Sequence, residues 1–508
     1  MKIMLQVTNL NHKYIYYFSK ELIKISNVSQ IQILTSSKKI GQKFHSLSNK
    51  IKIIEHSCDN YKNSEIENNS NLDFTKIKDF EIKNNISIWK IISSDRILGR
   101  EFLSIEGYEF DKSEDYKFIC KKTIQSFNQI DDILNLNKPD IFIAAFAQGN
   151  ILVKIINLLC LNKEILYLKP DITRIKNYAC FTRSENSFLE EVKTSYFDKN
   201  NIIDSSNEIY YELIKNFNTN YFDNNSPKLR IKKNNILQSA KNFFFDFMRV
   251  LKSSFINYLK DLKFKSLILK LSYNFKLLKN RNFYNENQKI FKKYLRSNQE
   301  IKNFVYFPLP VSPEYTSLEC PIFEDTFYLI KIISMQLPSD YVLVVKEHPA
   351  FLNNLIRSSS FYKKINKLPN VMICPTHLKQ TEMIEKSKLV LTVNGTAVWE
   401  SILLSKPVIT FDKCIHNVTE LSEKFISIDN LHTQIVDILK KNATISDQVR
   451  ERKVKKFISS IMENSFELTF PEIAFYVDFE DEKKFQITGE ELFEGFKNYL
   501  KKNEVLIF

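Results

Sequence analysis

Glycine is scarce in this chain, and no glycine-rich phosphate loop is present. Only 7 of the 508 residues are glycine. The Walker pattern and the G-x-G-x-x-G pattern both need several glycines close together, so that backbone amides can approach a phosphate, and neither pattern occurs. P-loop kinases and ordinary dehydrogenases therefore lose support as classes for this protein.

Paired cysteines and long apolar runs are missing as well. The 7 cysteines stand far apart, without the C-x-x-C or Cys/His spacing of a zinc site, which is typical of reduced thiols. Gln6 and Asn9 interrupt the apolar start of the chain, and no run of 18 apolar residues follows, so we expect no signal peptide and no transmembrane helix. No Asp-x-Asp pair stands at a predicted strand end. We therefore expect a cytoplasmic protein that needs no metal ion and no cofactor.

The positive charge is concentrated in one segment. Residues 228–296 contain 18 basic and 3 acidic residues, so their excess of +15 accounts for the net charge of +14 of the whole chain. Apolar side chains recur there at helical spacing, namely at Phe244, Phe247, Leu251, Phe255, Tyr258 and Leu262. This pattern predicts a helix that lies on an anionic membrane surface, or a helical insertion that packs on the protein. No nucleic-acid motif is present, so we expect no nucleic-acid partner.

The length and the alternation of strand and helix patterns predict the domain organisation. A chain of 508 residues is too long for one core. We expect an α/β fold with two Rossmann-like domains, at residues 1–225 and 301–465, that face a cleft. Residues 226–300 form the basic helical insertion between them. Residues 466–508 form a tail with a helix that can return to the first domain.

Two predicted strands of the second domain end in polar residues. Residues 341–346 are short, apolar and β-branched, and they lead into Lys346-Glu347-His348-Pro349. Residues 388–393 form a second such strand, after which Asn394-Gly395-Thr396 turns into a helix at 397–404. Ligands bind at the carboxyl ends of strands in parallel sheets, so both groups lie along one rim. Whether they converge depends on the strand order, which the sequence leaves open.

The residues on this rim are suited to a phosphate or diphosphate. Unpaired amides and the helix dipole favour an anion at the start of the helix, where Gly395 permits close approach and Thr396 can cap or donate. Lys346 adds a positive charge, and His348 adds one that is tunable. Each motif taken alone also fits a plain turn or a simple helix cap.

The order of these motifs resembles a known family. Lys-x-His-Pro, followed by Asn-Gly-Thr-x-x-x-Glu and, after five residues, Lys-Pro-Val-Ile, is similar to the C-terminal half of the GT-B glycosyltransferases that build bacterial capsular and surface polysaccharides. The resemblance is greatest to the capsule-synthesis family that includes the Kdo transferases. It is looser to the sialyltransferases with a His-Pro motif and to the CDP-glycerol transferases. The turn differs, because these families have Ser-Ser or Ser-Thr where this chain has Asn-Gly-Thr.

The resemblance implies roles for individual residues. His348 with Pro349, and the turn at Asn394-Gly395-Thr396, would hold the phosphate of the donor nucleotide, and Glu400 matches an acidic position that contacts the ribose. The loop at residues 308–317 resembles the family's Pro-Glu loop; it contains Glu314 and Ser317, and we assign Ser317 to donor binding.

A general base is needed if the transfer inverts the anomeric carbon. Glu314 is one candidate. Asp95, in Ser94-Asp95-Arg96, is the other, because surface-carbohydrate enzymes of this type carry a similar Asp-Arg pair in the N-terminal domain. The alternative for Asp95 is a helix cap that also forms an ion pair.

The sequence therefore predicts a metal-independent glycosyltransferase. It would move a sugar from a nucleotide-sugar, with a CMP-linked donor favoured, to a growing capsular or surface polysaccharide or a lipid-linked glycan. Three alternatives stay open: a CDP-glycerol-type glycerophosphotransferase, a sugar-nucleotide epimerase and a non-catalytic surface-assembly protein. Docking through residues 228–296 would place the protein at the inner face of the cytoplasmic membrane.

Overall fold

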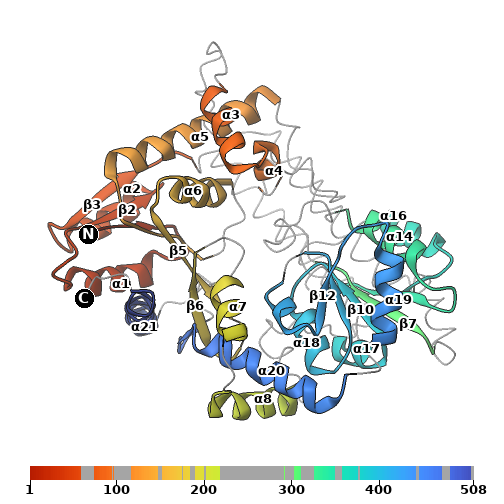
Figure 1. The fold of residues 1–508 in the computed structure, drawn as a ribbon. Helices are drawn as coiled ribbons and strands as arrows, with labels where there is room; N and C mark the ends of the chain where they lie inside the picture. Colours follow the sequence, from red (N-terminus) through yellow and green to blue (C-terminus); the bar gives the residue numbers. More distant parts are fainter. Residues whose placement is uncertain are drawn as a thin grey trace, which may run out of the picture. The chain divides into compact units, whose positions relative to one another are not determined.

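The computed structural model divides the chain into two compact units, which we describe one at a time (Figure 1). The first contains residues 1–100, 114–207 and 455–508, and the second contains residues 101–113 and 208–454. The structure describes residues 1–58, 74–93, 95, 116–146, 151–173, 175–183, 189–198, 202–217, 291, 302–310, 325–348, 357, 359–375, 378–412, 414–441, 445–471 and 481–504. Nearly all of the basic segment, together with Glu314, Ser317 and Pro349, therefore lies outside the described residues.

The first unit is built on a sheet of seven strands in the order β13-β6-β5-β4-β1-β2-β3. The strands are β1 (Lys2–Gln6), β2 (Gln30–Thr35), β3 (Ile51–Glu55), β4 (Ile141–Ile143), β5 (Leu166–Ile172), β6 (Tyr178–Thr182) and β13 (Phe466–Glu467). β1 to β5 pair in parallel, whereas β6 and β13 extend the sheet in antiparallel pairs. The central strands β1, β2 and β4 are buried on both faces, as expected when helices cover a parallel sheet on both sides, whereas the edge strands β3 and β13 are partly exposed.

Helices cover both faces of this sheet. They are α1 (His12–Ile23), α2 (Lys38–His45), α3 (Thr75–Asn84), α4 (Ile88–Ile92), α5 (Tyr116–Asn137), α6 (Ile151–Asn162), α7 (Leu189–Asp198) and α21 (Glu482–Lys502). Two more helices, α8 (Asp204–Phe217) and α20 (Asp447–Met462), each contain a boundary between the two units. None of the described helices is both long and apolar enough to cross a membrane.

The C-terminal helix α21 completes the core of the first unit. It packs beside α1 (Figure 1), and Phe493 and Phe496 of α21 contact the ring of Phe18 edge-on. Gly489 allows the close approach, because a Cβ there would stand 2.6 Å from the Tyr14 carbonyl oxygen. Residues from the two ends of the chain therefore share one core.

The second unit has a six-stranded parallel sheet in the order β12-β11-β10-β7-β8-β9. Its strands are β7 (Phe304–Pro308), β8 (Val342–Lys346), β9 (Val371–Cys374), β10 (Leu389–Thr392), β11 (Val408–Thr410) and β12 (Ser422–Lys424). Its helices are α14 (Thr326–Gln336), α16 (Ser359–Lys367), α17 (Gln380–Lys386), α18 (Thr396–Leu403) and α19 (Leu431–Lys441), with a short 3-10 helix, η4 (Ile415–Thr419). Two sheets made mostly of parallel strands confirm the predicted α/β class.

Alternation along β8 shows how the second unit buries its sheet. Successive side chains of a strand point to opposite faces. Leu343 and Val345 belong to one core cluster, together with residues of α14, α16 and α19. Val344 and Lys346 lie on the other face and are also buried. The side chain that reaches the surface at this end is therefore that of His348, two residues after Lys346.

The contact between α1 and α21 can be tested at Gly489. We expect Gly489→Ala to lower the free energy of unfolding of the first unit by about 1–2 kcal/mol, because the overpacking against Tyr14 and Tyr17 exceeds the gain of about 1 kcal/mol in helix propensity. Thermal unfolding followed by circular dichroism measures this. Glu490→Ala, at the exposed neighbouring position, is the matched control. A melting temperature that rises in Gly489→Ala would contradict the close packing.

Candidate functional site

The strand order of the second unit brings the two predicted corners to the same edge of the sheet. β8, which ends at Lys346, and β10, which ends at Thr392, both pair with β7. Neighbouring strands lie about 4.8 Å apart, so the ends of β8 and β10 are separated by about 10 Å. The chain adds β8 and β9 on one side of β7 and β10 to β12 on the other. The edge between β7 and β10 is therefore a topological switch point, where open α/β sheets bind ligands.

The turn after β10 has the geometry of an anion site. The Thr392 hydroxyl donates to the Asn394 carbonyl oxygen at 2.9 Å, and the Gly395 amide donates to the Asn394 side-chain oxygen at 2.7 Å. Gly395 has φ 102° and ψ −169°, a conformation that is strained for any residue except glycine. α18 begins at the next residue, Thr396, and among the described residues no side chain caps it. The first amides of α18 are therefore not occupied by a side-chain cap among the described residues, and such amides favour an anion.

The space in front of this turn is open. Gly395 and Thr396 are both exposed. A Cβ built on Gly395 would meet no described atom within 4 Å. Glycine is needed here for its backbone conformation, and a ligand can approach the backbone from this side.

His348 follows β8 and is neutral at pH 7. Its side chain reaches the surface, but the surrounding protein removes enough water to lower its pKa to about 4, and the nearby Lys346 ammonium adds to this effect. A neutral imidazole carries one N–H and one acceptor nitrogen. His348 can therefore donate a hydrogen bond to a phosphate oxygen without being an ion pair in the unliganded state.

Lys346 lies beneath this corner. Its side chain is 5% exposed, at the end of β8. The ammonium group lowers the pKa of His348. Burial raises the pKa of the Cys374 thiol to about 12, and the same ammonium group partly offsets that rise. Lys346 therefore contributes a positive potential below the rim.

Glu400 is the acidic residue in the second turn of α18, and it is 3% exposed. Its Oε2 accepts a hydrogen bond of 2.8 Å from the Gln380 amide at the start of α17. The structure therefore places Glu400 in a packed contact between α17 and α18. Its contact with a ribose stays a prediction.

Asp95 caps a helix of the first unit. Its carboxylate is 1% exposed, and Oδ2 accepts a hydrogen bond of 2.8 Å from the amide of Ile151, the first residue of α6. The helix cap that the sequence left open as an alternative is therefore formed. Its role as a general base stays a prediction, and so does that of Glu314, outside the described residues.

A cluster around Glu347 supports the His348 corner, and the sequence did not single it out. Glu347 is 0% exposed. Its Oε1 accepts from the His348 amide at 2.9 Å, and its Oε2 accepts from Arg357 Nε at 3.1 Å and from the Tyr362 hydroxyl at 2.7 Å. In the sequence, the only sign of this cluster is a charged residue directly before the His-Pro pair. Arg357 and Tyr362 follow at no regular spacing, so no pattern points to them.

A second unforeseen cluster lies at η4, which follows β11. The ring of His416 lies 5.4 Å from that of Trp399 of α18, centroid to centroid, and its Nδ1 is 2.8 Å from the Cys414 Sγ. Burial lowers the pKa of His416 to about 3 and raises that of Cys414 to about 12, so both groups are neutral at pH 7. The cluster packs against α18 from the side of β11.

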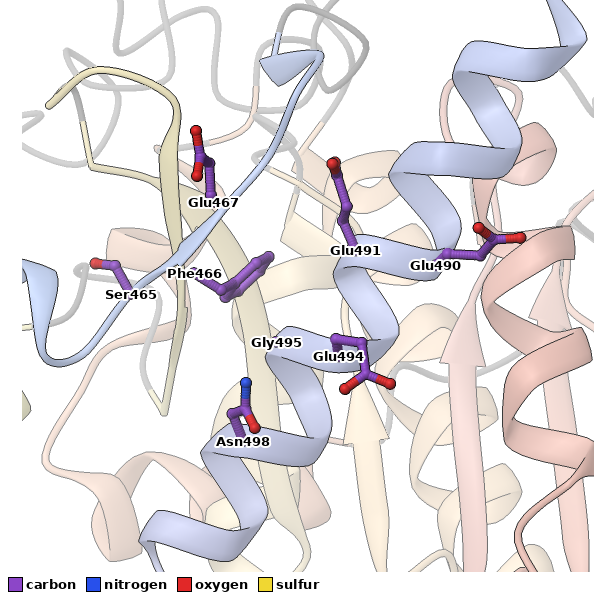
Figure 2. Close-up of a pocket in the computed structure, with 8 residues that line it drawn as sticks. All are labelled: Ser465, Phe466, Glu467, Glu490, Glu491, Glu494, Gly495 and Asn498. Atoms are coloured by element: carbon purple, nitrogen blue, oxygen red, sulfur yellow. The ribbon is translucent and has the colours of Figure 1, made fainter.

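A groove in the first unit contains none of the predicted site residues. It has a volume of about 420 Å³ and is lined by Ser465, Phe466, Glu467, Glu490, Glu491, Glu494, Gly495 and Asn498 (Figure 2). The Phe466 ring points toward Gly495 of α21 (Figure 2). Glu491 accepts hydrogen bonds from both the amide and the hydroxyl of Thr469. These contacts hold the segment after β13 against α21. The groove therefore follows from the packing of that segment on the helix.

Comparison with known proteins finds a family model that matches part of the chain, within the second unit. Residues 235–441 match the model for "capsule polysaccharide biosynthesis protein". The matched part comprises 207 residues, less than half of the chain, and is similar to that family. It contains both rim motifs, and the match confirms the resemblance that those motifs predicted. The prediction of a glycosyltransferase agrees with this family.

Individual proteins resemble this chain over shares of its length that differ widely. Protein FixF of Sinorhizobium fredii is 31% identical over 121 residues, which are 23% of this chain, and the chain spans 28% of the length of that relative. The "beta Kdo 2,7 transferase" KpsC of Thermosulfurimonas dismutans is 9% identical, with a TM-score of 0.31, over 73% of this chain and 89% of its own. The UDP-GlcNAc 2-epimerase of Neisseria meningitidis is 13% identical, with a TM-score of 0.24, over 91% and 100% of the two chains. At these TM-scores no conclusion follows from the two structures.

The neutral histidines of the second unit predict how stability depends on pH. The unfolded chain binds protons at His348 and His416 below pH 6.5, whereas the folded pKa values are about 4 and about 3. The free energy of unfolding should therefore fall as the pH is lowered from 6.5 toward 4. Denaturant unfolding measures the free energy of unfolding at pH 7 and pH 5. The difference between these two free energies should be smaller for His416→Gln than for the wild type.

The control for this experiment is His45→Gln, at an exposed position on α2 of the first unit. It should keep the wild-type difference between the two pH values. A His416→Gln variant with an unchanged difference would show that His416 takes up its proton equally well in the folded and unfolded chains.

Proposed function

We propose that the chain is a glycosyltransferase that moves a sugar from a nucleotide-sugar, with CMP-linked donors favoured, to a growing capsular or surface polysaccharide. One observation carries the proposal: the uncapped start of α18, with Gly395 in front of it, lies at the switch point of the second sheet, one strand away from His348. The family match supports the capsular pathway. The resemblance to the Kdo transferases is the reason to favour CMP.

The chemistry of this site is stabilisation of a leaving nucleotide phosphate. The bond between the anomeric carbon and the phosphate oxygen breaks, and the acceptor hydroxyl oxygen forms the new bond to that carbon. The backbone amides of α18 and the imidazole N–H of His348 donate hydrogen bonds to the phosphate. The Lys346 ammonium lowers the energy of the negative charge that grows on the phosphate. The proton of the acceptor hydroxyl passes to a general base, for which Asp95 and Glu314 are our candidates.

A donor panel separates this proposal from its alternatives on the same fold. Thermal shift with CMP-, CDP-, GDP- and UDP-linked donors, followed by product masses, distinguishes sugar transfer from glycerol phosphate transfer and from epimerisation. A CDP-glycerol product or an epimerised nucleotide-sugar would replace the proposed reaction. Binding of none of the donors would favour a non-catalytic assembly protein.

The phosphate corner is tested by His348→Ala. Loss of one hydrogen-bond donor to developing charge lowers turnover by about 10²–10³-fold in comparable sites, and we expect a decrease of about a hundredfold in kcat/KM for the donor. Steady-state kinetics with the best donor of the panel measures this. His432→Ala, at an exposed histidine of α19 in the same unit, is the control and should keep wild-type kinetics. Full donor turnover by His348→Ala would remove the phosphate assignment.

We also propose that residues 228–296 dock the protein on anionic membranes, which would supply a lipid-linked glycan acceptor. The motivation is the charge excess of +15 in this segment, where apolar residues recur at the spacing of a helix. Replacing Arg249, Lys252, Lys260 and Lys263 by Glu should abolish sedimentation with phosphatidylserine vesicles. The matched control replaces four exposed lysines outside this segment by Glu, at Lys363, Lys364, Lys386 and Lys424. Equal sedimentation of both variants would contradict docking through this segment.

A further inference from the structure

Glu347 is a buried carboxylate directly beside an exposed histidine. Its side chain is 0% exposed, whereas the next residue, His348, reaches the surface. Burial of a carboxylate is costly unless the charge is paired and its oxygens accept hydrogen bonds. Here both oxygens are used: Oε1 accepts from the His348 amide, and Oε2 accepts from Arg357 and Tyr362. Buried ion pairs of this kind are weak contributors to stability, so their use lies in the geometry that they impose.

Arg357 connects this carboxylate to the end of the neighbouring strand. Its Nη2 donates to the Pro310 carbonyl oxygen at 2.6 Å, just beyond β7, and its Nη1 donates to the hydroxyl of Thr326, the first residue of α14, at 3.3 Å. The ring of Phe361 lies 4.8 Å from the guanidinium carbon. One planar guanidinium group therefore joins the ends of β7 and β8 and the start of α14, in the fork geometry that Lys lacks.

The contact to Glu347 decides which part of His348 faces the rim. The His348 amide donates inward to Glu347 Oε1 at 2.9 Å, so it does not donate to a ligand. The imidazole is then the group of this residue that can contact a phosphate. An unpaired carboxylate at this place would repel an anion at the rim. Arg357 compensates the negative charge of Glu347, because its Nε lies 3.1 Å from Oε2 of that carboxylate.

From these contacts we propose that Glu347 is a positioning residue of the donor site. Its carboxylate, held by Arg357, fixes the backbone of His348 and so fixes the direction in which the imidazole leaves the end of β8 toward the donor phosphate. The inference rests on the proposed function, because it takes the donor phosphate to be the ligand of that imidazole. Glu347 itself touches neither substrate.

Two variants at the same carboxylate separate positioning from stability. Glu347→Gln keeps the length of the side chain, but its amide has one acceptor oxygen for three donors, so the His348 amide or Arg357 loses its partner. Tyr362→Phe removes one donor to Oε2 and leaves the His348 contact in place. Both variants lose a buried hydrogen bond. Their melting temperatures are measured first, so that a kinetic difference between them can be separated from a difference in stability.

We expect the KM for the nucleotide-sugar donor to rise about tenfold or more in Glu347→Gln, with the acceptor KM unchanged, because a misdirected imidazole weakens donor binding. Tyr362→Phe should stay within about twofold of the wild type in both KM values. A merely structural role would lower the amount of folded enzyme, and hence kcat, while both KM values stayed constant. An unchanged donor KM in Glu347→Gln would overturn the inference.

Hydrogen exchange at the His348 amide tests the same contact without any donor. Followed by mass spectrometry on the full chain, this amide should exchange slowly in the wild type and in Tyr362→Phe, and at least tenfold faster in Glu347→Ala. Equal exchange in all three proteins would overturn the inference even for an active enzyme. Failure of the proposed function has a different signature: the wild type would turn over none of the donors, and Glu347 would then have no donor role.

Discussion

The pairing of β7 with β8 on one side and β10 on the other is the constraint on which the candidate site depends. It sets the ends of three parallel strands side by side, and it makes the edge between β7 and β10 the switch point of the sheet. Residues far apart in sequence, such as His348 and Thr396, then share one edge. Their convergence does not need either motif to be unusual, because ordinary parallel pairing produces it.

The polar groups around this edge carry little free charge. His348 and His416 are neutral, and the Glu347 carboxylate is compensated by Arg357. The potential at the rim is therefore set mainly by the dipole and amides of α18 and by Lys346 below it. A phosphate can bind to such a site without displacing an acidic side chain from it. The hydrogen-bond donors also need to move little while negative charge develops on the phosphate.

The sequence predicts the elements of this site better than their connections. Strands at 341–346 and 388–393 and the helix after Gly395 follow from apolar, β-branched runs and a glycine turn, and the structure contains them within one or two residues. Strand order is not encoded in such local patterns. The same holds for the link from Glu347 to Arg357 and for the cap that Asp95 places on α6, 56 residues away, because each exists only after the sheet has formed.

The packing of α21 on α1 has a consequence for the order in which the chain can fold during synthesis. The core of the first unit uses Tyr14 and Phe18 from the start of the chain and Phe493 and Phe496 from near its end. Residues 208–454 are all made before α21 appears. On a ribosome, the second sheet can thus be complete while the first still exposes the apolar side of α1, a period in which chaperone binding or aggregation competes with native folding.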